Sequence, residues 1–171
     1  MACRGYFTAL QLPEAATLLE LKSVDERLEF INSLFAIAEN DGRVLLVDKS
    51  WDAMHRCLCG GWLDAKHSDE SMRSCVMGAR QLSNQANWII SYVDPDLVRR
   101  VNNAINAIEQ PWFRSQYFAL GRIPRGFMVH RYEIELTETD FEYTWEYFVE
   151  VKNFYRAAVH RGLAIVFAVD Q

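Results

Sequence analysis

The segment from Asp48 to Cys59 holds the densest group of chemically capable side chains in this sequence. If the segment is helical, Asp48, Asp52, His55 and Cys59 share one flank, because they are spaced four, three and four residues apart. Two carboxylates beside an imidazole could form an acid–base pair, with Asp52 orienting or charging His55. The same flank could instead bind a small ligand or hold a metal ion.

The flank also has an ordinary structural interpretation. Asp48 is a suitable N-cap, Asp52 can hydrogen-bond to His55 or Arg56, and His55 can tie the helix to a neighbouring loop. No oxyanion hole, activated nucleophile or phosphate-binding loop is recognisable nearby. We therefore expect no catalytic residue and no metal or cofactor. The segment supplies these candidates for contact with a ligand or partner: Asp48, Trp51, Asp52, His55 and Arg56.

A second feature is a segregation of charge. Residues 133–150 include seven acidic side chains and no Lys or Arg, whereas residues 97–131 include six Arg and one acid. Within the acidic stretch, a series of glutamates spaced four apart would lie along one helix: Glu138, Glu142, Glu146 and Glu150. Like charges at this spacing destabilise a helix by about 0.2–0.5 kcal/mol per pair. Solvent, the chain's own arginines or a basic protein partner could offset the repulsion, and the last alternative makes this helix an acidic partner face.

Composition narrows the classes of protein. A net charge of −5 argues against a protein that binds nucleic acid through phosphate contacts. No apolar run approaches the roughly 20 residues that span a bilayer, and the first ten residues do not resemble a secretory signal. The spacing of the four cysteines does not match a zinc or thioredoxin motif, so reduced and mostly buried thiols are expected. These observations predict a cytoplasmic protein without a membrane or nucleic-acid partner, and they leave its oligomeric state open.

The elements that must position these residues follow from periodicity and capping. Apolar runs predict strands, and N-cap residues, Pro and Gly delimit helices between them. The expected strands are 5–12, 88–93, 130–136 and 163–169, and the expected helices begin near residues 13, 24, 49, 69, 95, 111 and 139. The chain is thus predicted to form a single α+β domain over residues 1–171. Its small mixed sheet would combine N-terminal, central and C-terminal strands and be surrounded by helices.

Several segments resemble the YfbM-like family, a group of small bacterial proteins with a domain of unknown function. They are CRGYFTAL at 3–10, DKSWDAMHRCL at 48–58, WIISYVDP at 88–95, WF at 112–113 and FAVDQ at 167–171. The resemblance extends over nearly the whole chain. It implies a compact α+β domain of the bacterial cytoplasm and brings no established catalytic residues. It also implies a link to toxin–immunity settings, where related domains occur.

We therefore expect a non-enzymatic protein-interaction domain, with an immunity-type inhibitor of a bacterial toxin as its specific form and a basic protein as its partner. The alternative is a small-ligand-binding protein or an enzyme that uses the Asp48/Asp52/His55 flank. A third possibility is a structural subunit of a homo-oligomer. Acidic side chains already matched by the chain's arginines would argue against the first function, and a flank sealed inside the core would argue against the second.

Overall fold

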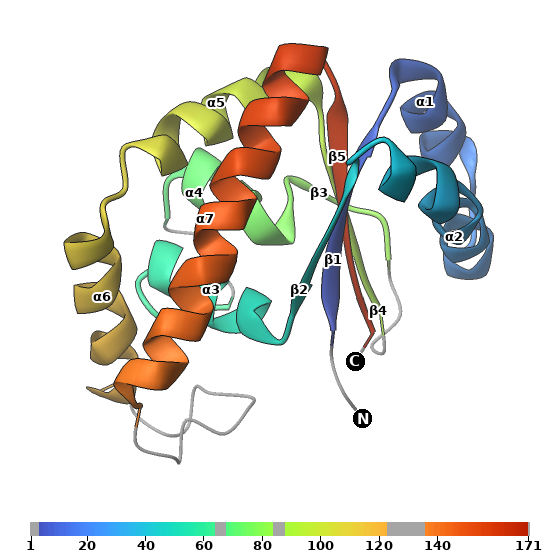
Figure 1. Cartoon of the computed structure of the whole chain (residues 1–171). Coiled ribbons are helices and arrows are strands. Elements are labelled where there is room, and N and C mark those ends of the chain that lie inside the picture. The colour runs from blue at the N-terminus through green and yellow to red at the C-terminus, as the bar shows by residue number, and fades with distance from the viewer. Residues whose placement is uncertain (1–3, 64–67, 84–87, 123–135, 171) are drawn as a thin grey trace.

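A five-stranded sheet with helices on both faces forms the framework (Figure 1). The computed structural model describes residues 4–63, 68–83, 88–122 and 136–170. The strands, in the spatial order β2-β1-β5-β4-β3, are β1 (Gly5–Leu10), β2 (Val44–Asp48), β3 (Arg80–Gln81), β4 (Trp88–Val93) and β5 (Ala164–Asp170). All four pairings are antiparallel, which differs from the mixed sheet expected from the sequence. The α+β class and the combination of N-terminal, central and C-terminal strands are confirmed.

The central position of β5 follows from its sequence. Ile165, Phe167 and Val169 belong to one core cluster, and the alternating residues Val166 and Ala168 belong to the other. Since successive side chains of a strand point to opposite faces, an almost wholly apolar strand must be covered on both sides. β5 pairs with β1 on one side and β4 on the other, so the two core clusters meet along this strand.

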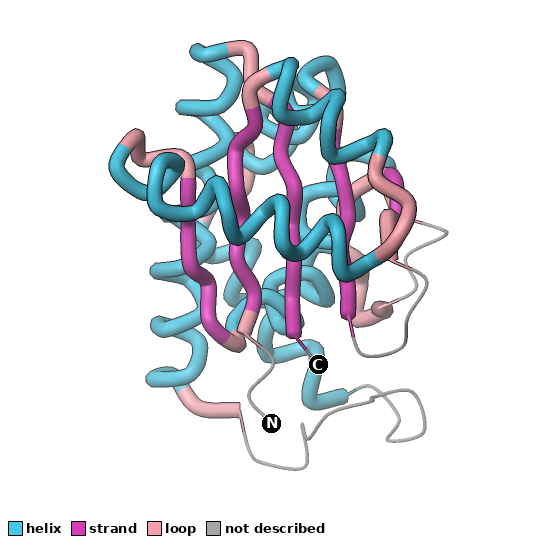
Figure 2. Tube along the Cα trace, turned by 90° about the vertical axis from the view of Figure 1, so that its right-hand side faces the viewer, coloured by secondary structure: helices cyan, strands magenta, loops and turns pink. Residues whose placement is uncertain are grey.

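The helices form two unequal layers. Helices α1 (Leu12–Glu20) and α2 (Val24–Asn40) cover one face of the sheet, and α2 runs across the strands in Figure 2. The other face is covered by α3 (Ser50–Leu58), α4 (Glu70–Met77), α5 (Pro95–Asn106), α6 (Gln110–Ala119) with the 3-10 turn η1 (Leu120–Arg122), and α7 (Glu138–Arg161) (Figure 1). Among the described residues, no helix is both long enough and apolar enough to cross a membrane.

Local signals set most helix ends as expected. At the start of α2, the Ser23 hydroxyl accepts from the Glu26 amide at 3.1 Å, and the Ser23 amide donates to Glu26 Oε2 at 2.9 Å. This is the capping box that the sequence predicts. Asp94 caps α5 through two backbone amides, and Gly162 ends α7 with a left-handed backbone, φ 64°. Helix α7 begins slightly earlier than expected, with Thr137 as its N-cap.

The sequence predicts the strands less completely than the helices. The sequence indicates only a short apolar lead-in before the third helix, but residues 44–48 form β2, which pairs with β1. The two-residue strand β3 was also not expected. Except for Leu136, the strand predicted at 130–136 falls outside the described residues, and Leu136 itself precedes α7 without strand structure. β2 is the more consequential addition, because it forms one edge of the sheet beside α7.

Candidate functional site

A groove of about 460 Å³ lies between the edge strand β2 and helix α7. Four of its lining residues come from α7 and one from β2: Tyr143, Glu146, Tyr147, Glu150 and Leu46. The α7 residues stand at positions i, i+3, i+4 and i+7, so they form one stripe along the helix. Two of them, Glu146 and Glu150, belong to the acidic face that the sequence predicts.

The groove rests on a well-packed support. The opposite face of α7 is buried through an apolar series in the core: Phe141, Phe148, Val151 and Tyr155. Phe148 stacks on Phe113 of α6, with ring centroids 4.5 Å apart and planes 16° apart. Burial of this face fixes the rotation of α7, so the acidic and tyrosine stripe is turned outward.

A hydrogen bond connects the two walls of the groove. The Tyr143 hydroxyl donates to Asp48 Oδ2 at 2.8 Å. Partial burial, followed by this contact with a carboxylate, raises the pKa of Tyr143, so the hydroxyl remains the donor at neutral pH. The rings of Tyr143 and Tyr147 meet edge to face at 5.0 Å. The two tyrosines therefore line the groove as a contiguous aromatic surface next to the carboxylates.

The acidic series on α7 is only partly neutralised inside the molecule. Glu138 forms an ion pair with Arg114 of α6. Glu142, Glu146 and Glu150 form no ion pair with any residue that the structure describes, and all three are exposed. Among the described residues, the arginines of 97–131 therefore form an ion pair with one glutamate of the series, Glu138. The remaining three leave negative charge on the surface of α7, and two of them, Glu146 and Glu150, line the groove.

Asp48 does not have the capping role expected from the sequence. It ends β2 with a positive φ of 44°, and α3 has Lys49 at its N-cap position with no side-chain cap. The backbone turns at this residue, so the Asp48 carboxylate lies beside Tyr143 of α7 and Arg4, with Arg4 Nε 3.4 Å from Oδ1. Asp48 is therefore separated from the other members of its predicted flank and belongs with the groove.

Asp52 pairs with Arg56 rather than with His55. Arg56 Nε lies 3.1 Å from Oδ1 and 3.0 Å from Oδ2 of Asp52, and Arg56 Nη1 donates to the Gly61 carbonyl at 3.1 Å. The Arg56 side chain is 1% exposed. The pair therefore closes the loop after α3 onto the helix, and Arg56 does not face a partner.

His55 and Trp51 are also buried. His55 Nε2 lies 3.0 Å from the Leu63 carbonyl, so this nitrogen carries the proton and donates, and Nδ1 lies 4.0 Å from Cys59 Sγ. Burial raises the pKa of Cys59 to about 11, so its thiol stays protonated. The ring of Trp51 packs against that of Phe167 in β5, with the ring centroids 5.9 Å apart. The structure thus gives no support to a partner-facing role for Trp51, His55 and Arg56, because all three side chains are buried.

The burial of His55 makes stability dependent on pH. Loss of solvation lowers the pKa of His55 below its ordinary value of 6.5, although the Leu63 carbonyl opposes the shift. Below pH 6.5 the unfolded chain binds a proton that the folded chain does not, so the free energy of unfolding falls as the pH falls, by up to about 1.4 kcal/mol per pH unit until the folded pKa is reached. In urea unfolding curves between about pH 5 and 8, His55→Gln is expected to remove this contribution. The exposed His160→Gln is the control, and an unchanged slope in the His55 variant would contradict the assignment.

Metal binding gains no support. Among the described residues, no group of three or more His, Cys, Asp or Glu side chains is arranged to hold a metal ion. The described cysteines, Cys57, Cys59 and Cys75, are buried free thiols, in agreement with the interpretation of their spacing. The residues that sequence reasoning missed are Leu46, Tyr143 and Tyr147. A signal for the tyrosines existed, because both fall off the apolar stripe of α7 and between its glutamates.

Fold and site together define a class: a small α+β domain in which an edge strand and a long helix form an acidic, tyrosine-lined groove. The chain belongs to the DUF1877 family, a domain of unknown function, whose model matches residues 1–168. This confirms the resemblance to YfbM-like proteins. The structure is similar to the crystal structure of YfbM, a protein of unknown function from Escherichia coli, with 16% sequence identity and a TM-score of 0.68 over 97% of this chain and 99% of that chain. At this identity the likeness shows the fold. No curated protein matches the sequence significantly.

Proposed function

We propose that this chain is a non-enzymatic protein-interaction domain whose groove between β2 and α7 binds a basic segment of a partner protein. The observation that carries this function is the row of glutamates on α7 that have no ion pair with the described residues: Glu142, Glu146 and Glu150. Their mutual repulsion is unfavourable in the free protein and is relieved when cationic side chains lie between them.

The other groove residues suit a Lys- or Arg-rich occupant. Tyrosine rings offer π faces to ammonium and guanidinium groups, and Tyr143 and Tyr147 place two such rings beside Glu146 and Glu150. Leu46 is 58% exposed and provides apolar contact for the aliphatic part of a long cationic side chain. Acidic and aromatic groups alternate along the helix, so the fitting partner is a segment in which basic and apolar contacts also alternate.

The position of β2 favours an extended segment. β2 is the outer strand of the sheet and pairs only with β1 among the described residues, so one side of its backbone lacks a strand partner. Such an edge is a template for main-chain hydrogen bonds with an added strand. A basic segment lying along β2 would place alternate side chains toward the α7 carboxylates. Backbone pairing would then contribute affinity, and the carboxylates would contribute specificity and a fast association.

An immunity-type inhibitor of a bacterial toxin is the specific form of this function that we favour. A toxin that acts on an anionic substrate carries cationic groups at its active site, and an acidic groove would cover them. We place the protein in the bacterial cytoplasm. Its buried free thiols are consistent with a reducing compartment.

Charge reversal in the groove tests the function. We expect Glu146→Lys/Glu150→Lys to slow the association of a fluorescent peptide of alternating Arg and Ser by about tenfold or more at low salt, because the steering field is reversed. The difference should shrink as salt rises, since screening removes long-range attraction. Stopped-flow fluorescence measures the association rate constant, and a Glu/Ser peptide should bind neither protein.

The matched control is Glu29→Lys/Glu39→Lys, which makes the same change in net charge at exposed positions of α2, on the other face of the sheet. It should keep most of the wild-type association rate. Equal losses in both double variants would mean that net charge alone attracts the peptide, and unchanged association in the groove variant would exclude the groove. The same three proteins then identify the native partner, which must be retained by the wild type and the control and lost by the groove variant.

A further inference from the structure

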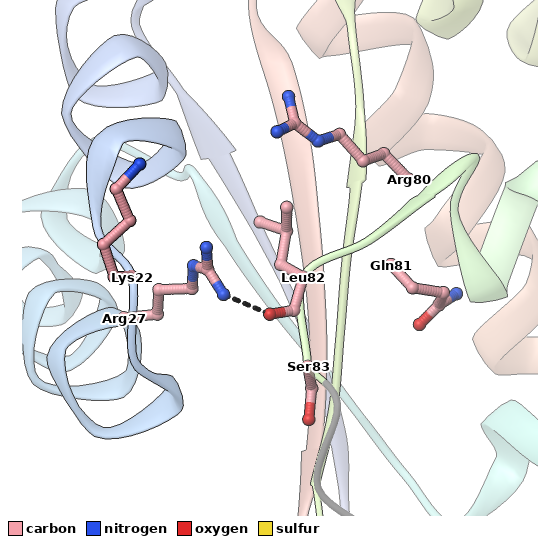
Figure 3. Close-up of a pocket in the computed structure, with 6 residues that line it drawn as sticks. All are labelled: Lys22, Arg27, Arg80, Gln81, Leu82 and Ser83. Atoms are coloured by element: carbon pink, nitrogen blue, oxygen red, sulfur yellow. Dashed lines mark hydrogen bonds between the residues drawn. The ribbon is translucent and has the colours of Figure 1, made fainter.

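A second cavity lies at the opposite edge of the sheet, between the start of α2 and the β3 segment (Figure 3). Its volume is about 190 Å³ and its exposed lining is mainly polar. The lining residues are Lys22, Arg27, Arg80, Gln81, Leu82 and Ser83. They come from two segments far apart in the sequence, so the cavity is a product of the fold.

Positive charge dominates this cavity. Lys22, Arg27 and Arg80 line it, and none of the described lining residues is a carboxylate, although the whole chain has a net charge of −5. None of the three cations forms an ion pair with a residue that the structure describes. The neighbouring Glu26 carboxylate accepts from the backbone amides of Lys22 and Ser23. Three cations thus share a small space without a bound acidic side chain.

Arg27 is the fixed member of the group. Its Nη1 donates to the Leu82 carbonyl, and its Nη2 donates to the Leu21 carbonyl at 2.5 Å. These two neutral acceptors hold the guanidinium in place, and the Glu26 carboxylate interacts with its charge electrostatically without forming an ion pair with it. Its buried Nε has no hydrogen-bond partner in the part of the chain that the structure describes. A guanidinium held in this way is preorganised for an anion, because little side-chain freedom remains to be lost on binding.

Lys22 and Arg80 provide the adjustable part of the cavity. Both side chains are exposed, and Figure 3 shows their charged ends extending toward the space beside the Arg27 guanidinium. Gln81 points away and donates to the Met77 carbonyl at 2.6 Å. In this view the two cationic ends lie on either side of a space above the Arg27 guanidinium (Figure 3).

We propose that this cavity binds the phosphate group of a small ligand. Phosphate carries up to two negative charges and several acceptor oxygens, which match three cations better than a single carboxylate does. The cavity is smaller than the roughly 300–1,000 Å³ typical of drug-sized ligands, so it accommodates an anionic group and leaves the rest of the ligand in solvent. The site lies at the sheet edge opposite the acidic groove, and it does not depend on the function proposed for that groove.

Isothermal titration calorimetry with inorganic phosphate at low ionic strength tests the site. The wild-type protein should bind one phosphate saturably, and Lys22→Gln/Arg80→Gln should weaken the affinity by about tenfold or more, because two charge-assisted contacts are lost. Arg99→Gln/Arg156→Gln is the matched control. It removes two positive charges at exposed positions of α5 and α7, on the other face of the sheet, and should bind like the wild type.

Three other results would contradict the proposed phosphate site. No saturable heat with the wild-type protein means that the cavity does not bind phosphate, and equal weakening in both double variants means attraction by net charge alone. Equal affinity for acetate means a site for any anion rather than for phosphate. Methyl phosphate and inorganic phosphate then distinguish the source of the group: tighter binding of methyl phosphate indicates a phosphate monoester, and tighter binding of inorganic phosphate indicates the free ion.

Discussion

Replacing Arg56 by Met is expected to lower the free energy of unfolding by about 3–5 kcal/mol. The Arg56 side chain is 1% exposed, its Nε faces both carboxylate oxygens of Asp52, and its Nη1 bonds the Gly61 carbonyl. Methionine fills a similar volume but removes the charge, so Asp52 keeps a largely buried carboxylate without its guanidinium. Urea unfolding at neutral pH measures the change, with circular dichroism as the probe.

Two further variants separate burial from simple loss of an ion pair. Arg100→Met removes an exposed pair with Glu70, in which the side chains are 56% and 47% exposed, and should cost less than about 1 kcal/mol. Asp52→Leu combined with Arg56→Met removes both buried charges and should recover part of the loss. If Arg56→Met and Arg100→Met destabilise equally, the buried pair does not have the structural role assigned to it.

Arg56→Met also distinguishes a structural role of α3 from a role in partner binding. Arg56 was a candidate for partner contact, but its contacts are internal. In the fraction that remains folded, Arg56→Met should therefore associate with the basic peptide at the wild-type rate. A selective loss of association without loss of stability would instead restore the helix α3 flank as a binding surface.

Local signals in the sequence predicted most of the helical framework. The Ser23–Glu26 box, the Asp94-Pro95 start and Gly162 each act within one helical turn, so they operate whatever the tertiary structure. The apolar run at 163–169 likewise predicted a strand covered on both faces, and β5 occupies the centre of the sheet. These features are determined by neighbours in the chain.

The flank around His55 was not predictable in the same way. Helical spacing predicts which residues share a flank of α3, but it does not determine which contacts they make. Arg56 reaches Asp52 from the next turn, where its Nε donates a bifurcated hydrogen bond to both carboxylate oxygens. The Gly61 carbonyl of the following loop accepts from Arg56, and the Leu63 carbonyl accepts from His55. The loop folds back over its helix through tertiary contacts, which leave no periodic pattern in the sequence. These contacts bury the side chains of His55 and Arg56.

The groove likewise combines residues that the sequence predicts with residues that only the fold brings into place. The glutamates of α7 were predicted because they depend on one helix, whereas the opposite wall depends on the sheet order. β2 was missed because it has only five residues and is partly exposed, so it lacks the strong alternation of a longer strand. Leu46 lines the groove, and Asp48 bonds to its Tyr143, only when β2 takes the edge next to β1. Reliable prediction of the site therefore required the strand pairing.

Arg43 is the residue that fastens this edge to the rest of the molecule. It immediately precedes β2 and is 1% exposed. Its Nη1 donates to the Ala9 carbonyl at 2.9 Å and to Glu14 Oε2 at 2.7 Å, and its Nη2 donates to Glu14 Oε1 at 3.2 Å. One guanidinium thus joins the start of β2 to the end of β1 and to α1. Nothing in the sequence pattern distinguishes it from the exposed arginines.

Arg43→Met should lower the free energy of unfolding by about 3–5 kcal/mol, because a largely buried Glu14 and the Ala9 carbonyl lose the guanidinium that donates to them, and Glu14 keeps only the Gln11 amide as a donor among the described residues. The loss of stability should differ between the strands of the sheet. Hydrogen exchange should show a larger loss of protection at the β2 amides than at those of β4 and β5, since β2 is held on one side only. Lys49→Met, at the exposed position that follows the far end of β2, should change stability by less than about 0.5 kcal/mol.

The Arg43 variant also connects the edge strand with binding. If the basic segment needs both walls of the groove, loosening β2 should weaken peptide binding even though every glutamate of α7 is retained. The affinity is measured where the variant is still folded, and Glu146→Lys/Glu150→Lys is the reference for loss of charge alone. Undiminished affinity, together with increased exchange in β2, would show that α7 alone binds the peptide and that the edge strand takes no part in recognition.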